Sequence, residues 1–277
     1  MAPSTPKTSW ARIMAPLSGG KGDVEVLAAA AELARPFGAE VSGVYAPADV
    51  ADLMPWMGEG FMGGVQITAV ESLKEAASQG EKNARAALEA CPCGARDFVT
   101  LESPVWASLA VESRLSDVVV FDNEAARGRG PLAEAFQQLV ANEQRPTVVA
   151  RPGLQADGVV AIAWDGGKEA TRAARTALPL LEKAAKVVIL GAPKASSREF
   201  DPVRLKEFLA ARGVEAEVEL LKEGGDAASL LLGAVRNIGA TLLVSGAFGH
   251  PRLREFIFGG TTRSFLAADR PSLFLSH

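Results

Sequence analysis

Short apolar runs alternate with amphipathic stretches along the second half of the chain. The runs at 159–163, 187–190, 241–244 and 272–275 are too short for globular helices, so each predicts a buried strand. Residues 214–221 alternate apolar and acidic side chains, which predicts a strand with one solvent-exposed face. Helical patterns at 168–184, 202–212 and 226–238, and a last one ending near 268, separate the strands. This alternation is typical of parallel βαβ units.

The first half repeats the same order of elements. It predicts strands at 12–15, 40–45, 97–100, 118–121 and 147–150, and helices at 24–35, 68–90, 105–115 and 131–142. Aligning Pro146 with Pro271 superimposes the ends of both halves without a gap. The pattern therefore predicts an internal duplication with a linker at 151–158. The predicted fold class is α/β, with two doubly wound open parallel-sheet (Rossmann-like) domains in tandem at 1–152 and 153–277.

Composition agrees with a globular protein of two domains. The chain has 277 residues, 48% of them hydrophobic, and 29 basic against 33 acidic side chains. A net charge of −4 argues against a polycationic nucleic-acid binder. We find no apolar run of membrane-spanning length and no apolar core of a secretory signal near the N-terminus, so we expect a cytoplasmic protein without a membrane partner.

The two cysteines, Cys91 and Cys93, are too few for a disulfide framework. Their one-residue spacing also differs from common zinc and thioredoxin-like motifs, so we expect free thiols at a helix end.

The charge is divided unequally between the halves. Residues 1–152 carry 13 basic and 19 acidic side chains, a net charge of −6, whereas residues 153–277 carry 16 and 14, a net charge of +2. An anionic ligand is therefore expected to prefer the second half.

A glycine-rich segment from Gly246 to Thr262 follows the strand at 241–244 and leads into the last helix. Glycines let a backbone approach a ligand closely, and N–H groups at the start of a helix form an anion cradle. The hydroxyls of Thr261 and Thr262 add donors, and His250 lies inside the segment. The alternative interpretation is that these glycines only form turns.

Asp165 follows the first strand of the second half, after Ala163 and Trp164. It would lie at the same sheet edge as the glycine-rich segment, where a ribose or base binds in such folds. The alternative is an aspartate that only caps a helix or closes an Asx turn.

These residues resemble the universal stress protein family, over almost the whole chain as two tandem copies. The family pattern is Gly-x2-Gly-x9-Gly-(Ser/Thr/Asn), and Gly246, Gly249 and Gly259 have that spacing. Gly260 stands where the family has a hydroxyl or amide. The resemblance implies that an adenine nucleotide such as ATP binds in the second half, with Mg²⁺ accompanying the phosphates. It implies as contact residues Ala163, Trp164, Asp165, Leu190, Ser245, Gly246, Gly249, His250, Gly259, Gly260, Thr261 and Thr262.

The first half lacks this pattern. Phe121, Glu124 and Glu134 stand at the three glycine positions, and Leu17 or Ser18 stands in place of Asp165. Glutamates in a phosphate cradle repel phosphate. We expect a degenerate copy without nucleotide that pairs with the second half.

Three functions follow from these observations. The first is a regulatory stress protein that binds ATP, ADP or AMP; the others are a slow ATPase or nucleotidyl-handling enzyme and a ligand-free interaction protein. A single internal histidine without a nucleophile gives no catalytic constellation, and no acidic cluster predicts a metal site. His277 is expected to be frayed. We expect a homodimer, formed through the last strands or through the Met-rich segment 47–66.

Overall fold

One ten-stranded sheet runs through the computed structural model, in the order β3-β2-β1-β4-β5-β10-β9-β6-β7-β8. The structure describes residues 9–47, 63–101, 105–191, 201–222, 224, 226–247 and 260–277. The strands are β1 (Arg12–Leu17), β2 (Glu40–Tyr45), β3 (Arg96–Thr100), β4 (Val118–Phe121), β5 (Thr147–Val149), β6 (Val159–Trp164), β7 (Lys186–Gly191), β8 (Ala216–Leu220), β9 (Leu242–Gly246) and β10 (Ser272–Ser276). Every strand predicted from the sequence is present, with ends within about two residues.

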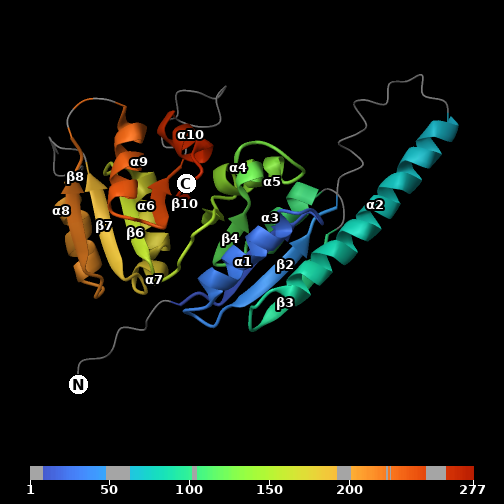
Figure 1. The fold of residues 1–277 in the computed structure, drawn as a ribbon, viewed down its shortest axis with the longest axis horizontal. Coiled ribbons are helices and arrows are strands. Elements are labelled where there is room, and N and C mark those ends of the chain that lie inside the picture. Colours follow the sequence, from blue (N-terminus) through green and yellow to red (C-terminus); the bar gives the residue numbers. More distant parts are fainter. Residues whose placement is uncertain are drawn as a thin grey trace.

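Helices connect most of these strands (Figure 1). They are α1 (Asp23–Ala34), α2 (Gly63–Ala90), α3 (Val105–Ser113), α4 (Asn123–Ala126), α5 (Ala133–Ala141), α6 (Lys168–Thr176), α7 (Leu178–Leu181), α8 (Pro202–Ala210), α9 (Ala227–Asn237) and α10 (Gly260–Ala267). The single helix predicted at 168–184 is wrong, because the chain breaks at Ala177 and restarts as α7 with Pro179 in its first turn. Helix α4 is not predicted by the sequence pattern.

The sheet repeats one strand order and joins the two copies edge to edge. Strands 3-2-1-4-5 of the first half correspond in order to strands 8-7-6-9-10 of the second. Within each half the pairs are parallel, but β5 and β10 pair antiparallel, with Val148 opposite Phe274. The two doubly wound halves are confirmed, yet they form one sheet rather than two separate ones. The last strands therefore pair within the chain, so the expected dimer contact through them is wrong, because neither has a free edge. The carboxyl edges of the halves face opposite ways.

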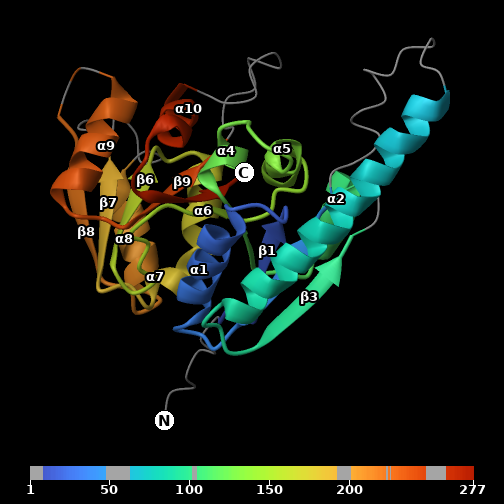
Figure 2. The ribbon, with the colours of Figure 1, turned by 45° about the vertical axis from the view of Figure 1, so that its right-hand side comes forward.

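Two helical layers cover the sheet, and each buries a core that crosses both halves. One core lies under α1, α2, α6, α7 and α8, and the other lies under α3, α4, α5, α9 and α10. Figure 2 shows α1 and α2 over the same face of the first half. Trp10 links the halves directly, because its ring stacks on that of Phe274 with centroids 6.2 Å apart.

The predicted linker is a packed segment. Arg151 is only 2% exposed and Ala156 is fully buried. The Ala156 amide donates to Glu32 Oε1 of α1 at 2.8 Å.

The segment predicted as a Met-rich loop, 47–66, overlaps α2 from Gly63 onward, and residues 48–62 lie outside the described residues. Within the part of the chain that the structure describes, no helix combines the length and apolar character needed to cross a membrane.

Candidate functional site

Strand order reverses between β6 and β9, which makes their carboxyl edge the switch point of the second half. Val160 of β6 pairs with Leu242 of β9, and Ser276 of β10 pairs with Gly246. The ends of β6 and β9 therefore meet at one edge, as the sequence predicts. Residues that follow these strands are placed to contact a ligand there.

Asp165 lies exposed immediately after β6. Its Oδ1 accepts a hydrogen bond from the Gly167 amide at 2.8 Å, which is an Asx turn leading into α6. Asp165 therefore closes an Asx turn, as one of the two interpretations of the sequence predicts. Its exposed carboxylate nevertheless stands at the switch-point edge, where the second oxygen can accept from a ligand.

Gly246 ends β9 against the first turn of α6. A Cβ at this position would lie 2.6 Å from Ala170 N and 2.7 Å from the Glu169 carbonyl carbon. Backbone atoms cannot swing aside, so glycine is required for strand and helix to pack this closely. The close packing of β9 on α6 is enough to explain a glycine at position 246. The same packing brings the buried Glu169 to this edge, a residue that the sequence pattern does not single out.

Helix α10 begins with Gly260, followed by the exposed Thr261 and the buried Thr262. A Cβ on Gly260 would meet no described atom within 4 Å. Because β9 and β10 are parallel, α10 returns from their carboxyl edge to their amino edge, which places its first turn at the switch-point edge. Three predicted contact residues, Gly249, His250 and Gly259, lie outside the described residues.

Other predicted contact residues are turned into the core. The side chain of Leu190 is fully buried and that of Trp164 is 9% exposed, each in a different core. Ala163 is half-buried. Ser245 is buried and its hydroxyl donates to the Gly246 carbonyl at 2.9 Å. The implied packing of Leu190 against an adenine would therefore have to use backbone atoms, because its side chain faces away from solvent.

The C-terminal residue is anchored, so the expected fraying is wrong. His277 Nδ1 lies 2.8 Å from the Ala247 carbonyl oxygen, a hydrogen-bond distance. Arg172 of α6 donates to the His277 carbonyl and to Gln144 Oε1. These contacts hold the end of β10 beside the end of β9, and only tertiary structure reveals them.

The opposite end of α10 is held by two arginines of the first half. Arg151 donates through Nη2 to the Phe265 carbonyl at 2.8 Å and through Nη1 to the Pro271 carbonyl at 2.7 Å. Arg127 donates to the Ala267 carbonyl at 2.8 Å. Burial lowers the pKa of Arg151 to about 10, which still leaves the guanidinium charged at neutral pH. Cations at a helix C-terminus also complement its dipole.

Comparison with known structures identifies the architecture. A universal stress protein from Archaeoglobus fulgidus DSM 4304 superposes with a TM-score of 0.68 and 16% identity, over 96% of this chain and 95% of that one. A putative universal stress protein from Pseudomonas aeruginosa UCBPP-PA14 gives 0.54 and 13%, over 96% and 93%. The chain has the universal stress protein fold. A functionally unknown protein from P. aeruginosa PAO1 shares this fold, with a TM-score of 0.55 at 12% identity over 96% and 92%. No sequence-family model and no curated protein match the chain.

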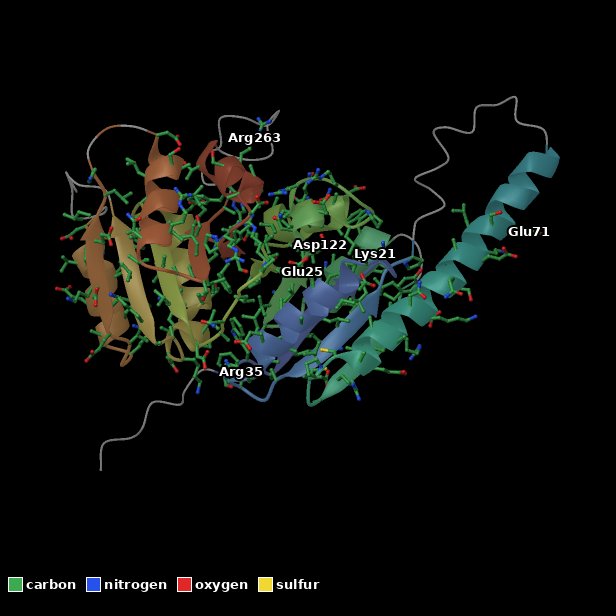
Figure 3. All side chains as sticks on the ribbon, in the orientation of Figure 1. Lys21, Glu25, Arg35, Glu71, Asp122 and Arg263 are labelled. Atoms are coloured by element: carbon green, nitrogen blue, oxygen red, sulfur yellow. The ribbon has the colours of Figure 1, made fainter. Side chains whose placement is uncertain are left out.

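In the first half of this universal stress fold, carboxylates crowd the corresponding edge. Asp23 is 3% exposed and accepts from the amides of Ser18 and Gly19, so it closes the turn after β1. Asp122 follows β4 and caps α4 by accepting from the Ala125 amide at 2.7 Å. Burial raises the pKa of Asp23 and of Asp122. Burial and the nearby Asp122 charge also raise the pKa of Glu25, which lies beside Asp122 in Figure 3.

Two of the three residues at the first half's glycine positions make contacts of their own. Phe121 is fully buried, with its ring edge-on to that of Phe136 at 5.5 Å. Glu124 pairs with Arg129 at 2.8 Å on the surface.

The cysteines are free, as the sequence predicts, and follow α2. Burial raises the pKa of Cys91 to about 11, so its thiol is a weak nucleophile at neutral pH. Among the described residues, no three His, Cys, Asp or Glu side chains gather as a metal site.

Proposed function

We propose that this protein is a regulatory stress protein that binds an adenine nucleotide in its second half. The observation that carries the proposal is the first turn of α10 at the switch-point edge, beside the ends of β6 and β9, where a Cβ on Gly260 would meet no described atom. Doubly wound sheets bind ligands at this position. The slight positive charge of residues 153–277 favours the same half for a phosphate ligand.

The described residues fit a nucleotide with one reservation. The first amides of α10 and the exposed Thr261 hydroxyl can donate to phosphate oxygens, and Asp165 can accept from a ribose hydroxyl. Gly260 offers space but no hydroxyl, so one donor of the family pattern is missing. Such a bond to a charged group contributes about 1.5–3 kcal/mol, enough to weaken binding without abolishing it.

The first half is proposed to bind no nucleotide. Asp23, Glu25 and Asp122 share its switch-point edge, and their carboxylates would repel phosphates. That edge instead carries Arg127 and Arg151, which donate hydrogen bonds to backbone carbonyls near the end of α10 in the second half. The first half would therefore support the nucleotide-binding second half by holding the end of α10.

Binding would act through stability rather than rapid chemistry. A ligand present at 100 times its Kd stabilises the folded state by about 2.7 kcal/mol. Because α10 would carry the ligand at one end and the guanidinium contacts at the other, occupancy would also stabilise the junction between the halves. Mg²⁺, where present, would neutralise phosphate charge as part of the bound nucleotide.

Mass spectrometry of the denatured, freshly purified protein tests the proposal. Co-purified ATP, ADP or AMP, together with one calorimetric site per chain, supports it. If the protein neither co-purifies with a nucleotide nor binds one in the titration, the proposal is refuted and a ligand-free interaction protein is favoured. Phosphate release from ATP that disappears in Asp165→Ala would favour the slow ATPase instead.

We further propose a cytoplasmic homodimer with domains at 1–152 and 153–277. Pairing of β5 with β10 inside the chain leaves β3 and β8 as the edge strands of the described sheet. Light scattering coupled to size exclusion measures the assembly, and a strictly monomeric mass across concentrations would refute the dimer.

A further inference from the structure

The turn between α2 and β3 carries both cysteines of the chain (Figure 2). Cys91 directly follows the last residue of α2, and Pro92 is the single residue between it and Cys93. Two residue steps span at most about 7 Å, and the Cα atoms that a disulfide joins lie about 4.4–6.8 Å apart. The turn therefore brings the two Cα atoms to a separation that a disulfide can bridge.

The two thiols interact with each other and differ in exposure. The thiol and the backbone amide of Cys93 both lie within hydrogen-bond range of the Cys91 sulfur. Cys91 is 7% exposed and belongs to the core under α1 and α2, whereas Cys93 is half-buried and packs against the same core. An oxidant in solvent therefore reaches Cys93 first, and the Cys91 sulfur is the neighbouring group that can react next.

The surroundings of Cys91 keep its sulfur beside that of Cys93. The Cys91 thiol donates to the Leu27 carbonyl of α1 at 3.5 Å. The Arg96 guanidinium donates to the Glu89 carbonyl at 2.8 Å and to the Cys91 carbonyl at 3.5 Å, which fixes the end of α2. Burial raises the pKa of Cys91, and the positive charge of Arg96 partly offsets this by favouring the thiolate. A thiol held next to its partner reacts without a diffusional search, which compensates for its small ionised fraction.

From these contacts we propose that Cys91 and Cys93 form a reversible intramolecular disulfide when the protein meets hydrogen peroxide. The Cys93 thiolate attacks one peroxide oxygen, so that an S–O bond forms and the O–O bond breaks. The oxygen that departs leaves as hydroxide and takes up the proton that Cys93 lost, which gives water and a sulfenic acid on Cys93.

The second step closes the disulfide. The Cys91 thiol loses its proton and its sulfur attacks that of Cys93, so that the S–S bond forms and the S–O bond breaks. The hydroxide that leaves takes up the Cys91 proton as a second water molecule. The two thiols together lose two electrons, which the peroxide gains. A thiol reductant restores both cysteines by disulfide exchange.

The effect of this disulfide on the protein is local. A closed loop with one intervening residue gains little stability from chain entropy, because that gain grows with loop length. The oxidised Cys91 sulfur can no longer donate to the Leu27 carbonyl, so oxidation removes a hydrogen bond between α2 and α1. Neither cysteine belongs to the proposed nucleotide site, so the disulfide can form whether or not the second half binds a nucleotide.

Peptide mapping of the full chain after exposure to hydrogen peroxide tests the proposal. Trypsin cleaves after Arg85 and Arg96, so both cysteines lie in one peptide, residues 86–96. After removal of peroxide, N-ethylmaleimide in urea labels both thiols of the reduced peptide, whereas the disulfide form takes no label and is lighter by two hydrogen atoms. We expect peroxide to convert wild type to the disulfide form, and dithiothreitol to restore two thiols that accept the label.

Two serine variants separate the roles of the cysteines. Cys91→Ser leaves Cys93 without a partner, so peroxide should leave a sulfenic acid on Cys93 that dimedone traps. Cys93→Ser keeps only the buried thiol, which should stay reduced at peroxide doses that fully oxidise wild type. Cys93 is half-buried at a turn, so we expect Cys93→Ser to fold like wild type, and the wild-type map depends on neither variant.

Three results would overturn the proposal. The first is a wild-type peptide that accepts two labels after peroxide treatment. The second is a disulfide that joins two chains in place of one within the chain, seen as a linked pair of peptides. The third is oxidation of Cys91 in Cys93→Ser at the same peroxide dose as in wild type.

Discussion

Arg151 donates a hydrogen bond to the carbonyl oxygen of Phe265 across 2.8 Å, and this contact joins the two halves of the chain. The two residues are 114 positions apart in sequence. Arg151 follows the last strand of the first half, and Phe265 lies near the end of α10. The carboxyl edge of the first half therefore holds the helix whose opposite end faces the proposed nucleotide.

Replacing Arg151 with methionine should destabilise the protein by about 3 kcal/mol. The substitution leaves Asn123 Oδ1 and the carbonyls of Phe265 and Pro271 without their donor, and a buried unsatisfied acceptor costs about 1–3 kcal/mol. Urea unfolding at constant m-value measures the loss. Arg236→Met, at an exposed position, should change stability by less than about 0.5 kcal/mol. Equal urea midpoints for Arg151→Met and Arg236→Met would show that the hydrogen bonds of Arg151 do not stabilise the folded protein.

Asp122→Asn should alter how stability depends on pH. Burial raises the folded-state pKa of Asp122, so wild-type stability from this group is full below its unfolded pKa and falls as pH rises through the folded value. Asparagine removes that fall and still accepts from the Ala125 amide. At neutral pH the variant should gain less than about 1 kcal/mol, because solvent screens this partly exposed group.

Thermal or urea unfolding between about pH 4 and 7 measures the slope for Asp122→Asn. Asp226→Asn is the matched control, because Asp226 also caps a helix but hydrogen bonds from Ser229 lower its pKa. Wild-type stability from Asp226 is lost only below its unfolded pKa of about 3.9, so the control should leave the slope between pH 4 and 7 nearly unchanged. The same change of slope in both variants would contradict a raised pKa at Asp122.

Gly246→Ala should cost about 1–3 kcal/mol, because its Cβ would overlap backbone atoms of α6. Gly260→Ala, where a Cβ meets no described atom, should be neutral or stabilise by up to about 1 kcal/mol. Calorimetric melting of the two variants gives the comparison. A Gly246→Ala protein as stable as wild type would mean that β9 and α6 do not pack as the structure shows.

Gly260→Ser should tighten ATP binding about tenfold, because it places a hydroxyl at the start of α10, where a Cβ meets no described atom. Gly260→Ala adds the Cβ without the donor and should bind like wild type. Isothermal titration compares the three proteins. Unchanged affinity in Gly260→Ser would remove the first residue of α10 from the binding site.

Local pattern predicted most elements of the fold, because burial on both faces makes parallel strands read as short apolar runs. Asp226 was predicted as a helix cap, and its side chain accepts from the Ser229 amide. The antiparallel junction of β5 and β10 was not predicted, since two apolar strands show no preference for a partner or direction. The burial of Arg151 was missed for a similar reason, because its acceptors belong to distant residues.

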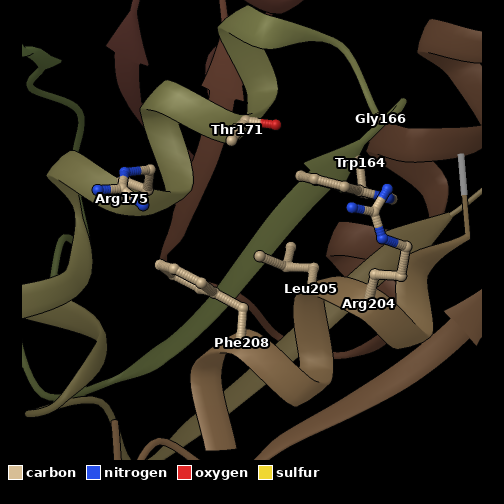
Figure 4. Close-up of a pocket in the computed structure, with 7 residues that line it drawn as sticks. All are labelled: Trp164, Gly166, Thr171, Arg175, Arg204, Leu205 and Phe208. Carbon is tan, nitrogen blue, oxygen red and sulfur yellow. The ribbon is translucent and has the colours of Figure 1, made fainter. Parts of the chain in front are cut away.

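The sequence predicted where the candidate site lies, but not how its side chains are oriented. Asp165 directly follows β6, Gly246 ends β9 and Thr261 lies in the first turn of α10. Trp164 was assigned to this site from its neighbours in sequence, but alternation along β6 turns its side chain toward α6 and α8 (Figure 4). The packing role of Gly246 depends on how closely α6 approaches, which spacing does not reveal.

Calorimetric titration of ATP into wild type, Gly260→Asp and Gly260→Asn decides whether the second half holds the nucleotide. A Cβ at position 260 meets no described atom, and an aspartate is favourable at a helix N-terminus, so the expected effect of Gly260→Asp is repulsion of phosphate rather than unfolding. We predict one site per chain in wild type, retained in Gly260→Asn and lost in Gly260→Asp. No binding by wild type, two sites per chain, or equal binding by the two variants would contradict a single nucleotide site at α10.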